Sequence, residues 1–155
     1  MHHYTESCLD NIYLEDGFKE YRTPHGVAIS IEDTAGLHKA IGCRIIERPS
    51  PLRGAELKFL RIEMKTSQRI LATILGTREQ TLRLWEKHRT KALPGPSDRL
   101  LRALFSDYDF GSGSVRRMLI ALARFDQAKR QQEHFRKTSK GWKALQSPSR
   151  SRSES

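Results

Sequence analysis

The chain has 155 residues, of which 37% are hydrophobic and 30% are charged, and its formal net charge is +10. This length suits one ordinary domain, or a small domain with an appendage. No run of about 18 apolar residues occurs, which argues against a membrane-spanning helix. The start, MHHYTESCLDNIYLED, lacks the basic and then apolar regions of a secretion signal. We therefore expect a cytoplasmic protein, and in that compartment Cys8 and Cys43 should be reduced thiols.

The positive charge is concentrated in two parts of the chain. Residues 1–53 carry 6 Lys and Arg against 8 Asp and Glu, whereas residues 54–104 carry 11 against 5 and residues 115–155 carry 11 against 3. A segregated basic region is typical of a polyanion binder, because neutralising phosphates releases counterions and supplies much of the affinity. The basic end of the chain could instead serve only solubility, but this explanation fits residues 54–104 less well.

The N-terminal segment, residues 1–53, is expected to combine short strands with one helix. Runs of aromatic and β-branched residues are separated by the turn signals Asp16-Gly17 and Pro24-His25-Gly26. This pattern predicts two or three strands, of which AISIE should be half buried. A helix should follow, capped by Asp33 or Thr34 and ending before the prolines at 49 and 51. Its apolar face consists of Leu37, Ile41 and Ile45.

Residues 54–110 are predicted to form a compact all-α domain. Apolar residues recur at helical spacing in stretches of roughly 8 to 11 residues, and helices this short must pack on one another to be stable. The last of them should begin at a Ser97 or Asp98 cap. The apolar helix positions are Leu57, Leu60, Met64, Ile70, Leu71, Ile74, Leu75, Leu82, Trp85, Leu100, Leu101, Leu104 and Phe105.

The end of the chain is expected to hold one more helix. After a flexible joint, YDFGSGS, residues 115–138 are predicted to form an amphipathic helix with a basic outer face, packed on the domain or on a second subunit. Residues 139–155 are rich in Ser and Arg without an apolar period, which predicts a disordered basic tail. The apolar face of the helix consists of Val115, Met118, Leu119, Leu122 and Phe125.

The stretch SQRILATILGTREQTLRLWE, residues 67–86, has the spacing of two short helices packed across a turn. Two helices that approach closely need a small residue in the first, and the turn needs a residue that tolerates a positive φ; Ala72 and Gly76 stand at these positions. In the second helix, Leu82 and Trp85 should face the core. The outward face should then carry Arg78, Glu79, Gln80, Thr81, Arg83 and Lys87.

These residues carry a family resemblance. The stretch RIEMKTSQRILATILGTREQTLRLWEK, residues 61–87, resembles the Xre or lambda-repressor-like helix-turn-helix, and with its flanking helices the match covers about a third of the chain. The resemblance implies a mainly α fold, with a five-helix-type helix-turn-helix domain over residues 54–110 after a small β-containing segment. The matching positions are Arg61, Ser67, Gln68, Leu71, Ala72, Leu75, Gly76, Thr81, Leu82, Trp85 and Glu86.

The resemblance also implies roles in binding double-stranded DNA. Gln can pair with adenine, Arg with guanine, and Glu can accept from cytosine. Leu84 stands where relatives carry a polar reader, and it is either a contact for a thymine methyl or a core residue. Thr77 and Arg78 weaken the capping of the second helix. The predicted base-reading residues are Glu79, Gln80, Arg83 and Leu84. The predicted backbone contacts are Gln68, Arg69, Arg78, Thr81, Lys87 and Arg89.

The flanking segments are similar to MqsA-type antitoxins, in which a zinc ion lies between two Cys pairs. This chain has no Cys-x-x-Cys motif. Cys8, His25, His38 and Cys43 have irregular spacing, whereas a tetrahedral zinc site needs about four ligands in closing geometry, so we expect no metal. No catalytic constellation or Gly-rich phosphate loop is recognisable, so we expect no cofactor and no enzyme.

The sequence favours two functions. The first is a sequence-specific transcriptional regulator in the nucleoid, acting as a repressor that binds a palindromic operator as a homodimer, because two-fold pairing doubles the readout of one short helix. Its subunits would meet through residues 100–105 or 115–125. The second is an antitoxin-like protein whose acidic N-terminal half, residues 4–48, binds a toxin or other partner while the helix-turn-helix regulates its own operon. A third possibility, a small-ligand sensor, has no pocket that the sequence can reveal.

Overall fold

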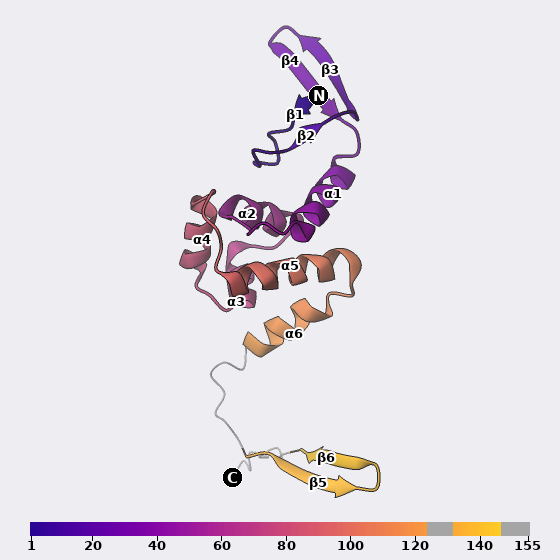
Figure 1. The fold of residues 1–155 in the computed structure, drawn as a ribbon, viewed down its shortest axis with the longest axis vertical. Helices are drawn as coiled ribbons and strands as arrows, with labels where there is room; N and C mark the ends of the chain where they lie inside the picture. The colour runs from indigo at the N-terminus through magenta and orange to yellow at the C-terminus, as the bar shows by residue number, and fades with distance from the viewer. Residues whose placement is uncertain (124–131, 147–155) are drawn as a thin grey trace, which may run out of the picture. The chain divides into compact units, whose positions relative to one another are not determined.

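The computed structural model describes residues 1–123 and 132–146 (Figure 1). The chain divides into two compact units, Met1–Arg124 and Phe125–Ser155. Within the described residues it is mostly α-helical with three small antiparallel sheets, which confirms the predicted fold class at this coarse level. None of the helices in these described ranges is long and apolar enough to cross a membrane.

The N-terminal strands lie largely where the turn signals predicted them. β3 (Phe18–Thr23) pairs with β4 (Gly26–Ile31) as a hairpin, and β2 (Tyr13–Leu14) precedes Gly17, whose φ of 74° suits the predicted turn. Ile29 and Ile31 are half-buried, as the alternating pattern indicated. β1 (His2–His3) pairs with β2 and was not predicted, because a two-residue strand has no period to detect.

Helix α1 (Thr34–Glu47) joins these strands to the helical domain. Asp33 is its N-cap, since the Asp33 carboxylate accepts a hydrogen bond from the backbone N–H of Gly36, and the helix ends before Pro49, as predicted. Ile41 and Ile45 are buried in the core. The predicted cap, end and apolar face of this helix are therefore confirmed.

The helical domain continues with α2 (Gly54–Glu63), α3 (Gln68–Leu75), α4 (Glu79–Lys87) and α5 (Gly95–Phe110). α5 packs against α1 and α3, and α2 packs against α1 and α4. The prediction that Ile70 belongs to the core is wrong. Ile70 is exposed, because Leu71 and Ile74 form the buried face of α3. The buried centre of the core includes Leu57, Leu60, Leu71, Leu82, Leu101, Leu104 and Phe105.

Helix α5 corrects three sequence-based expectations. It begins at Gly95 after Pro94, and Asp98 is not its cap. The Asp98 carboxylate instead accepts hydrogen bonds from the Leu52 backbone N–H (2.7 Å) and from Nε of Arg102 (2.6 Å), so it ties the preceding loop to the helix. The helix spans 16 residues to Phe110, longer than predicted, and takes in part of the segment predicted as a flexible joint.

The end of the chain also differs from prediction. α6 (Ser114–Ala123) is helical as expected, but β5 (His134–Thr138) and β6 (Gly141–Leu145) form a hairpin, so the predicted helix over 115–138 is wrong at 134–138. The predicted disorder of 139–155 is wrong over 139–146, because a turn with Gly141 at a φ of 118° closes that hairpin. Phe125 and residues 147–155 lie outside the described residues.

Candidate nucleic-acid interface

Helices α3 and α4 pack closely across a tight turn. Ala72 is buried where α3 meets its neighbours, and Gly76 ends α3 in the left-handed conformation, with φ 69° and ψ 30°. The Thr77 backbone N–H donates to the Ala72 carbonyl at 2.9 Å, which closes the turn. Both predictions for this turn are confirmed, because a small residue and a residue tolerant of positive φ stand where the geometry requires them.

The C-terminal end of α4 is fixed against the start of α2. The Ala55 backbone N–H donates to the Arg89 carbonyl at 3.1 Å, and the Gly54 N–H donates to the Lys91 carbonyl at 3.2 Å. A Cβ atom at Gly54 would lie 1.9 Å from the Trp85 carbonyl oxygen, so only glycine allows this approach. Two N-terminal N–H groups of α2, which have no partners within the helix, are thus satisfied while α4 is held in place.

A polar network under α4 connects three helices. Glu86, 6% exposed, accepts hydrogen bonds from Arg61 through Nε (2.5 Å) and Nη2 (3.3 Å), and from Nε2 of Gln68 (2.6 Å). Arg61 also donates to the Thr66 carbonyl at 3.1 Å. The buried carboxylate is therefore both paired and hydrogen-bonded, as a buried charge must be. The sequence matched these positions to a family pattern, but it did not reveal that they contact one another.

Gln68 and Arg83 extend this network to the surface. Nε of Arg83 donates to Oε1 of Gln68 at 3.2 Å, and Nη2 of Arg83 donates to Oε1 of Glu79 at 2.7 Å. Both ends of the Gln68 amide are thus engaged inside the domain. The Arg83–Glu79 pair lies open to solvent at i,i+4 spacing, and pairs of this kind are worth only about 0.3–0.5 kcal/mol. Arg83 can therefore exchange this partner for another at little cost.

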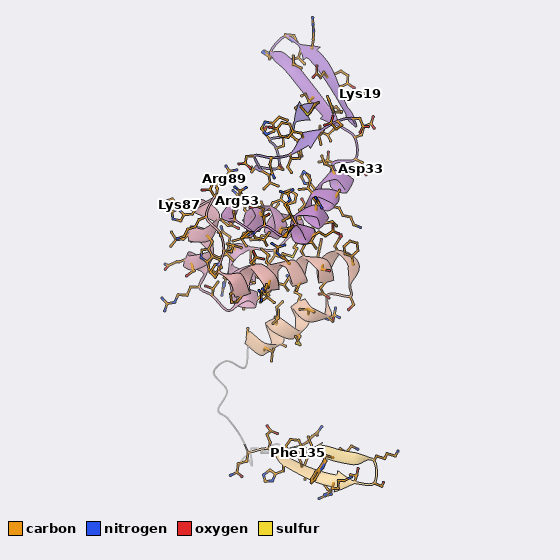
Figure 2. The ribbon with its side chains drawn as sticks, in the orientation of Figure 1. Lys19, Asp33, Arg53, Lys87, Arg89 and Phe135 are labelled. Carbon is orange, nitrogen blue, oxygen red and sulfur yellow. The ribbon has the colours of Figure 1, made fainter. Side chains whose placement is uncertain are left out.

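The outer face of α4 is open to solvent. Gln80, Arg83 and Lys87 are exposed, and Thr81 is half-buried; Figure 2 shows Lys87 at the rim of the helical domain. Leu84 is 53% exposed, so its alternative assignment as a core residue is wrong. It borders a groove of about 460 Å³ whose other walls include apolar residues of the α4–α5 loop.

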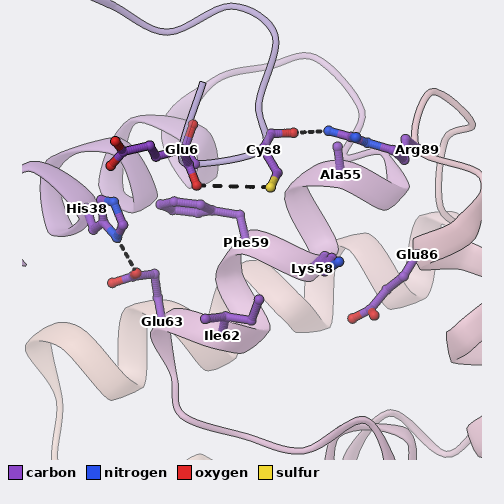
Figure 3. A pocket seen from close by; sticks show the side chains of 11 residues that line it. Glu6, Cys8, His38, Ala55, Lys58, Phe59, Ile62, Glu63, Glu86 and Arg89 are labelled. Atoms are coloured by element: carbon purple, nitrogen blue, oxygen red, sulfur yellow. Dashed lines mark hydrogen bonds and ion pairs between the residues drawn. The ribbon is translucent and has the colours of Figure 1, made fainter. Parts of the chain in front are cut away.

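The remaining predicted backbone contacts lie at the edges of this face. Arg69 is exposed on α3, and Arg78 is exposed at the N-cap of α4, where no side-chain hydrogen bond caps the helix, as the sequence predicted. Arg89 follows α4, and its Nη2 donates to the Cys8 carbonyl of the N-terminal segment (Figure 3). Arg89 thus connects the end of α4 to the N-terminal segment, and no sequence signal indicated this contact.

A separate pocket lies between the N-terminal segment and α2. Its volume is about 150 Å³, and Figure 3 shows Phe59 and Ile62 among its lining residues. On one side, His38 bridges Tyr4 and Glu63, with Nε2 2.7 Å from the Tyr4 hydroxyl and Nδ1 2.7 Å from the Glu63 carboxylate. Burial, together with the carboxylates of Glu6 and Glu63, raises the pKa of the Tyr4 phenol.

The Cys and His residues considered as metal ligands do not form a cluster. Cys8 and Cys43 are free thiols, and His38 is engaged with its two partners in the pocket. The Cys43 thiol donates to the Asp109 carboxylate at 3.1 Å, and burial and this hydrogen bond raise the pKa of Cys43. Within the described ranges, no three His, Cys, Asp or Glu side chains are close enough to hold a metal ion.

Comparisons of this chain with protein-family models, with curated proteins and with solved structures found no match.

Proposed function

We propose that this chain is a sequence-specific DNA-binding transcriptional regulator whose α3–turn–α4 unit acts as a helix-turn-helix. One observation carries the proposal: α4 is anchored by its buried face through Leu82 and Glu86, while Gln80, Arg83 and Lys87 are exposed together on the other face. A helix that is fixed from behind and polar in front can enter the major groove, where base edges display distinct hydrogen-bond patterns.

The contacts within the domain distinguish residues proposed to read bases from a residue proposed to position α4. A bidentate contact between Arg and guanine is worth about 1–3 kcal/mol of discrimination, which exceeds the value of the solvent-exposed pair between Arg83 and Glu79. Arg83 is therefore a proposed base reader, together with Gln80, and the exposed Leu84 suits a thymine methyl. Gln68, engaged by Glu86 and Arg83, acts mainly as a positioning residue that fixes α4.

The positive charge supports a phosphate partner. Residues 54–104, which contain α2 to α4 and most of α5, carry 11 Lys and Arg against 5 Asp and Glu. Arg69, Arg78 and Lys87 are exposed around the proposed reading face. Such side chains supply affinity that does not depend on sequence and that falls as the salt concentration rises.

Repression by a homodimer on a palindromic operator completes the proposal. The predicted dimer surface at residues 100–105 is wrong for Leu101, Leu104 and Phe105, because these side chains are buried in the core of their own domain. α6 packs on α3 and α5 with Val115 and Leu119 half-buried, as one of the two predicted arrangements required, but its Met118 and Leu122 are exposed. We expect α6 to form the dimer contact, and Met118→Glu should convert dimer to monomer in sedimentation velocity while the CD spectrum stays unchanged.

Fluorescence anisotropy tests this function. It compares binding of the chain to the DNA upstream of the gene with binding to scrambled DNA of equal length, over a salt series. A preference of about a thousandfold for the upstream fragment is expected of a specific regulator. Gln80→Ala should reduce that preference, and Lys87→Ala should weaken binding to both DNAs. Lys19→Ala is the charge-matched control, since Lys19 lies on β3, far from Lys87 in Figure 2. Equal binding to both DNAs by the unmodified chain would refute sequence-specific regulation.

A protein partner for residues 4–48 is a second candidate. The β3–β4 hairpin exposes Tyr21 and Val27, and exposed apolar side chains that lie together are typical of surfaces that contact another protein. The acidic balance of residues 1–53 suits a basic partner such as a toxin. Co-expression with the product of the neighbouring gene, followed by purification of either a complex or two separate proteins, tests this candidate.

A further inference from the structure

The C-terminal hairpin has one face that combines aromatic and basic side chains. In the antiparallel register, Lys137 pairs with Trp142 and Phe135 pairs with Ala144, and directly paired residues lie on the same face of a hairpin. Phe135 and Trp142 are diagonal neighbours on this face, at a separation of roughly 7–8 Å between positions of this type. Figure 2 shows Phe135 on β5. The other face carries His134, Arg136, Lys143 and Leu145.

Both aromatic rings are open to solvent. Phe135 is 61% exposed and Trp142 is 72% exposed, although large aromatic side chains are usually buried in a core or an interface. A two-stranded hairpin has no core of its own, so these rings remain available to a partner. The function proposed for α4 makes no use of these two residues.

The net positive charge of the hairpin indicates which kind of partner this face can bind. Residues 132–146 contain four cations, Arg136, Lys137, Lys140 and Lys143, against the single carboxylate of Glu133. This excess repels a second copy of the same hairpin and attracts a polyanion. An aromatic face with adjacent lysines has the composition of surfaces that bind single-stranded nucleic acid, because bases stack on the rings while cations contact the phosphates.

We propose that the β5–β6 hairpin binds single-stranded nucleic acid, with Trp142 and Phe135 stacking on two bases and Lys137 contacting the backbone between them. Lys137 suits this role because it lies opposite Trp142 and two residues after Phe135 on the same face. The stacking is tolerant of sequence, since every base has a π-face. This activity is distinct from the proposed reading of duplex DNA by α4 and does not depend on it.

The test uses the full chain and a fluorescein-labelled thymidine oligomer of about 12 nucleotides, a length within the usual range of such sites. Trp142→Leu keeps an apolar cross-strand contact but removes the π-face, and it should weaken binding roughly tenfold. Trp142→Tyr retains a ring and should bind nearly as well as the unmodified chain. Leu145→Ala is the matched control, because it removes exposed apolar surface from the opposite face of the same hairpin.

Intrinsic fluorescence gives a second readout. The oligomer should quench the emission of Trp142, and Trp142→Phe should abolish that part of the quenching while the signal of the half-buried Trp85 remains. Gln80→Ala should leave binding of the oligomer unchanged, so a failure of the duplex-reading proposal would be seen separately.

Two results would overturn the proposal. The first is oligomer binding by Trp142→Leu that equals binding by the unmodified chain. The second is an equal loss in Trp142→Leu of duplex and oligomer binding, which would make the hairpin a duplex contact. If Trp142→Leu also changed the assembly state of the protein while its binding of the thymidine oligomer stayed unchanged, the face would be a contact between copies of the chain.

Discussion

Replacing Glu86 by leucine is expected to lower the free energy of unfolding of the helical domain by about 3 kcal/mol. The carboxylate is 6% exposed and accepts three hydrogen bonds, two from Arg61 and one from Gln68. In Glu86→Leu, the Arg61 guanidinium keeps only its contact with the Thr66 carbonyl. Removing one partner of a buried pair costs about 3–5 kcal/mol, and the lower end applies because the Arg61 side chain is 14% exposed and can reach water.

Urea unfolding followed by far-ultraviolet CD measures this effect. With a slope of about 2 kcal/mol per molar urea, a loss of about 3 kcal/mol lowers the midpoint by roughly 1.5 M. A double-mutant cycle isolates the pair: Arg61→Met should also be destabilising, but the double variant should cost less than the sum of the single variants by about 2 kcal/mol. If the two costs added, or if Glu86→Leu shifted the midpoint by less than about 0.5 M, the network would not hold α4 as described.

Three further predictions follow from single positions. Gly54→Ala should destabilise the domain by more than about 2 kcal/mol, because its Cβ would collide with the Trp85 carbonyl, whereas Gly95→Ala, with open space around its Cβ, should be nearly neutral in the same urea titration. Gly76→Ala should cost about 1–2 kcal/mol through its positive φ alone, since no atom lies within 4 Å of the added Cβ; a neutral effect would contradict the left-handed conformation at this position. Finally, the raised pKa of Tyr4 means that the folded chain keeps the phenol proton more tightly than the unfolded chain. The contribution of Tyr4 to the free energy of unfolding should therefore be fully present below the ordinary Tyr pKa of 10.0 and should decline as pH rises through the pKa of the folded state. Tyr4→Phe should reduce that alkaline decline in unfolding experiments from about pH 9 to about pH 11.

Several parts of the fold could be read from local signals. Asp33 caps α1 because a short carboxylate side chain can accept from an N–H three residues ahead, a preference that belongs to the residue itself. Gly76 ends α3 for a similar reason, since glycine enters the left-handed conformation without steric cost. The apolar spacing of α1, α2 and α4 predicted their buried faces, because the helical period depends only on the backbone.

The residues proposed for the interface come from the sequence, whereas the contacts among them come only from the structure. The sequence pointed to Gln68, Arg83 and Glu86 separately, yet the network that joins them depends on how α2, α3 and α4 cross. Asp98 was predicted as a helix cap, but packing places the 50–53 loop near enough for Asp98 to bind the Leu52 backbone instead. The exposure of Leu84 likewise depended on which face of α4 met the core.

The C-terminal hairpin carries a local turn signal that its composition conceals. Thr23-Pro24-His25-Gly26 and Thr138-Ser139-Lys140-Gly141 close the two hairpins in the same way, with the Thr hydroxyl donating to the Gly carbonyl at 2.7 Å and 2.8 Å. The first turn lies between apolar and β-branched runs, and these runs indicate a hairpin. The second lies in a stretch rich in Ser and Lys, and its composition concealed a turn that the spacing of Thr and Gly could have revealed.

By itself, the sequence determined the helical periods of the domain, the Asp33 cap, the Gly76 turn and the placement of positive charge along the chain, because each depends on the chemistry of neighbouring residues. The tertiary structure decided which polar side chains are buried together and which remain free. Burial and pairing are set by residues far apart in the chain, such as Arg61 and Glu86, and they arise only when the helices pack.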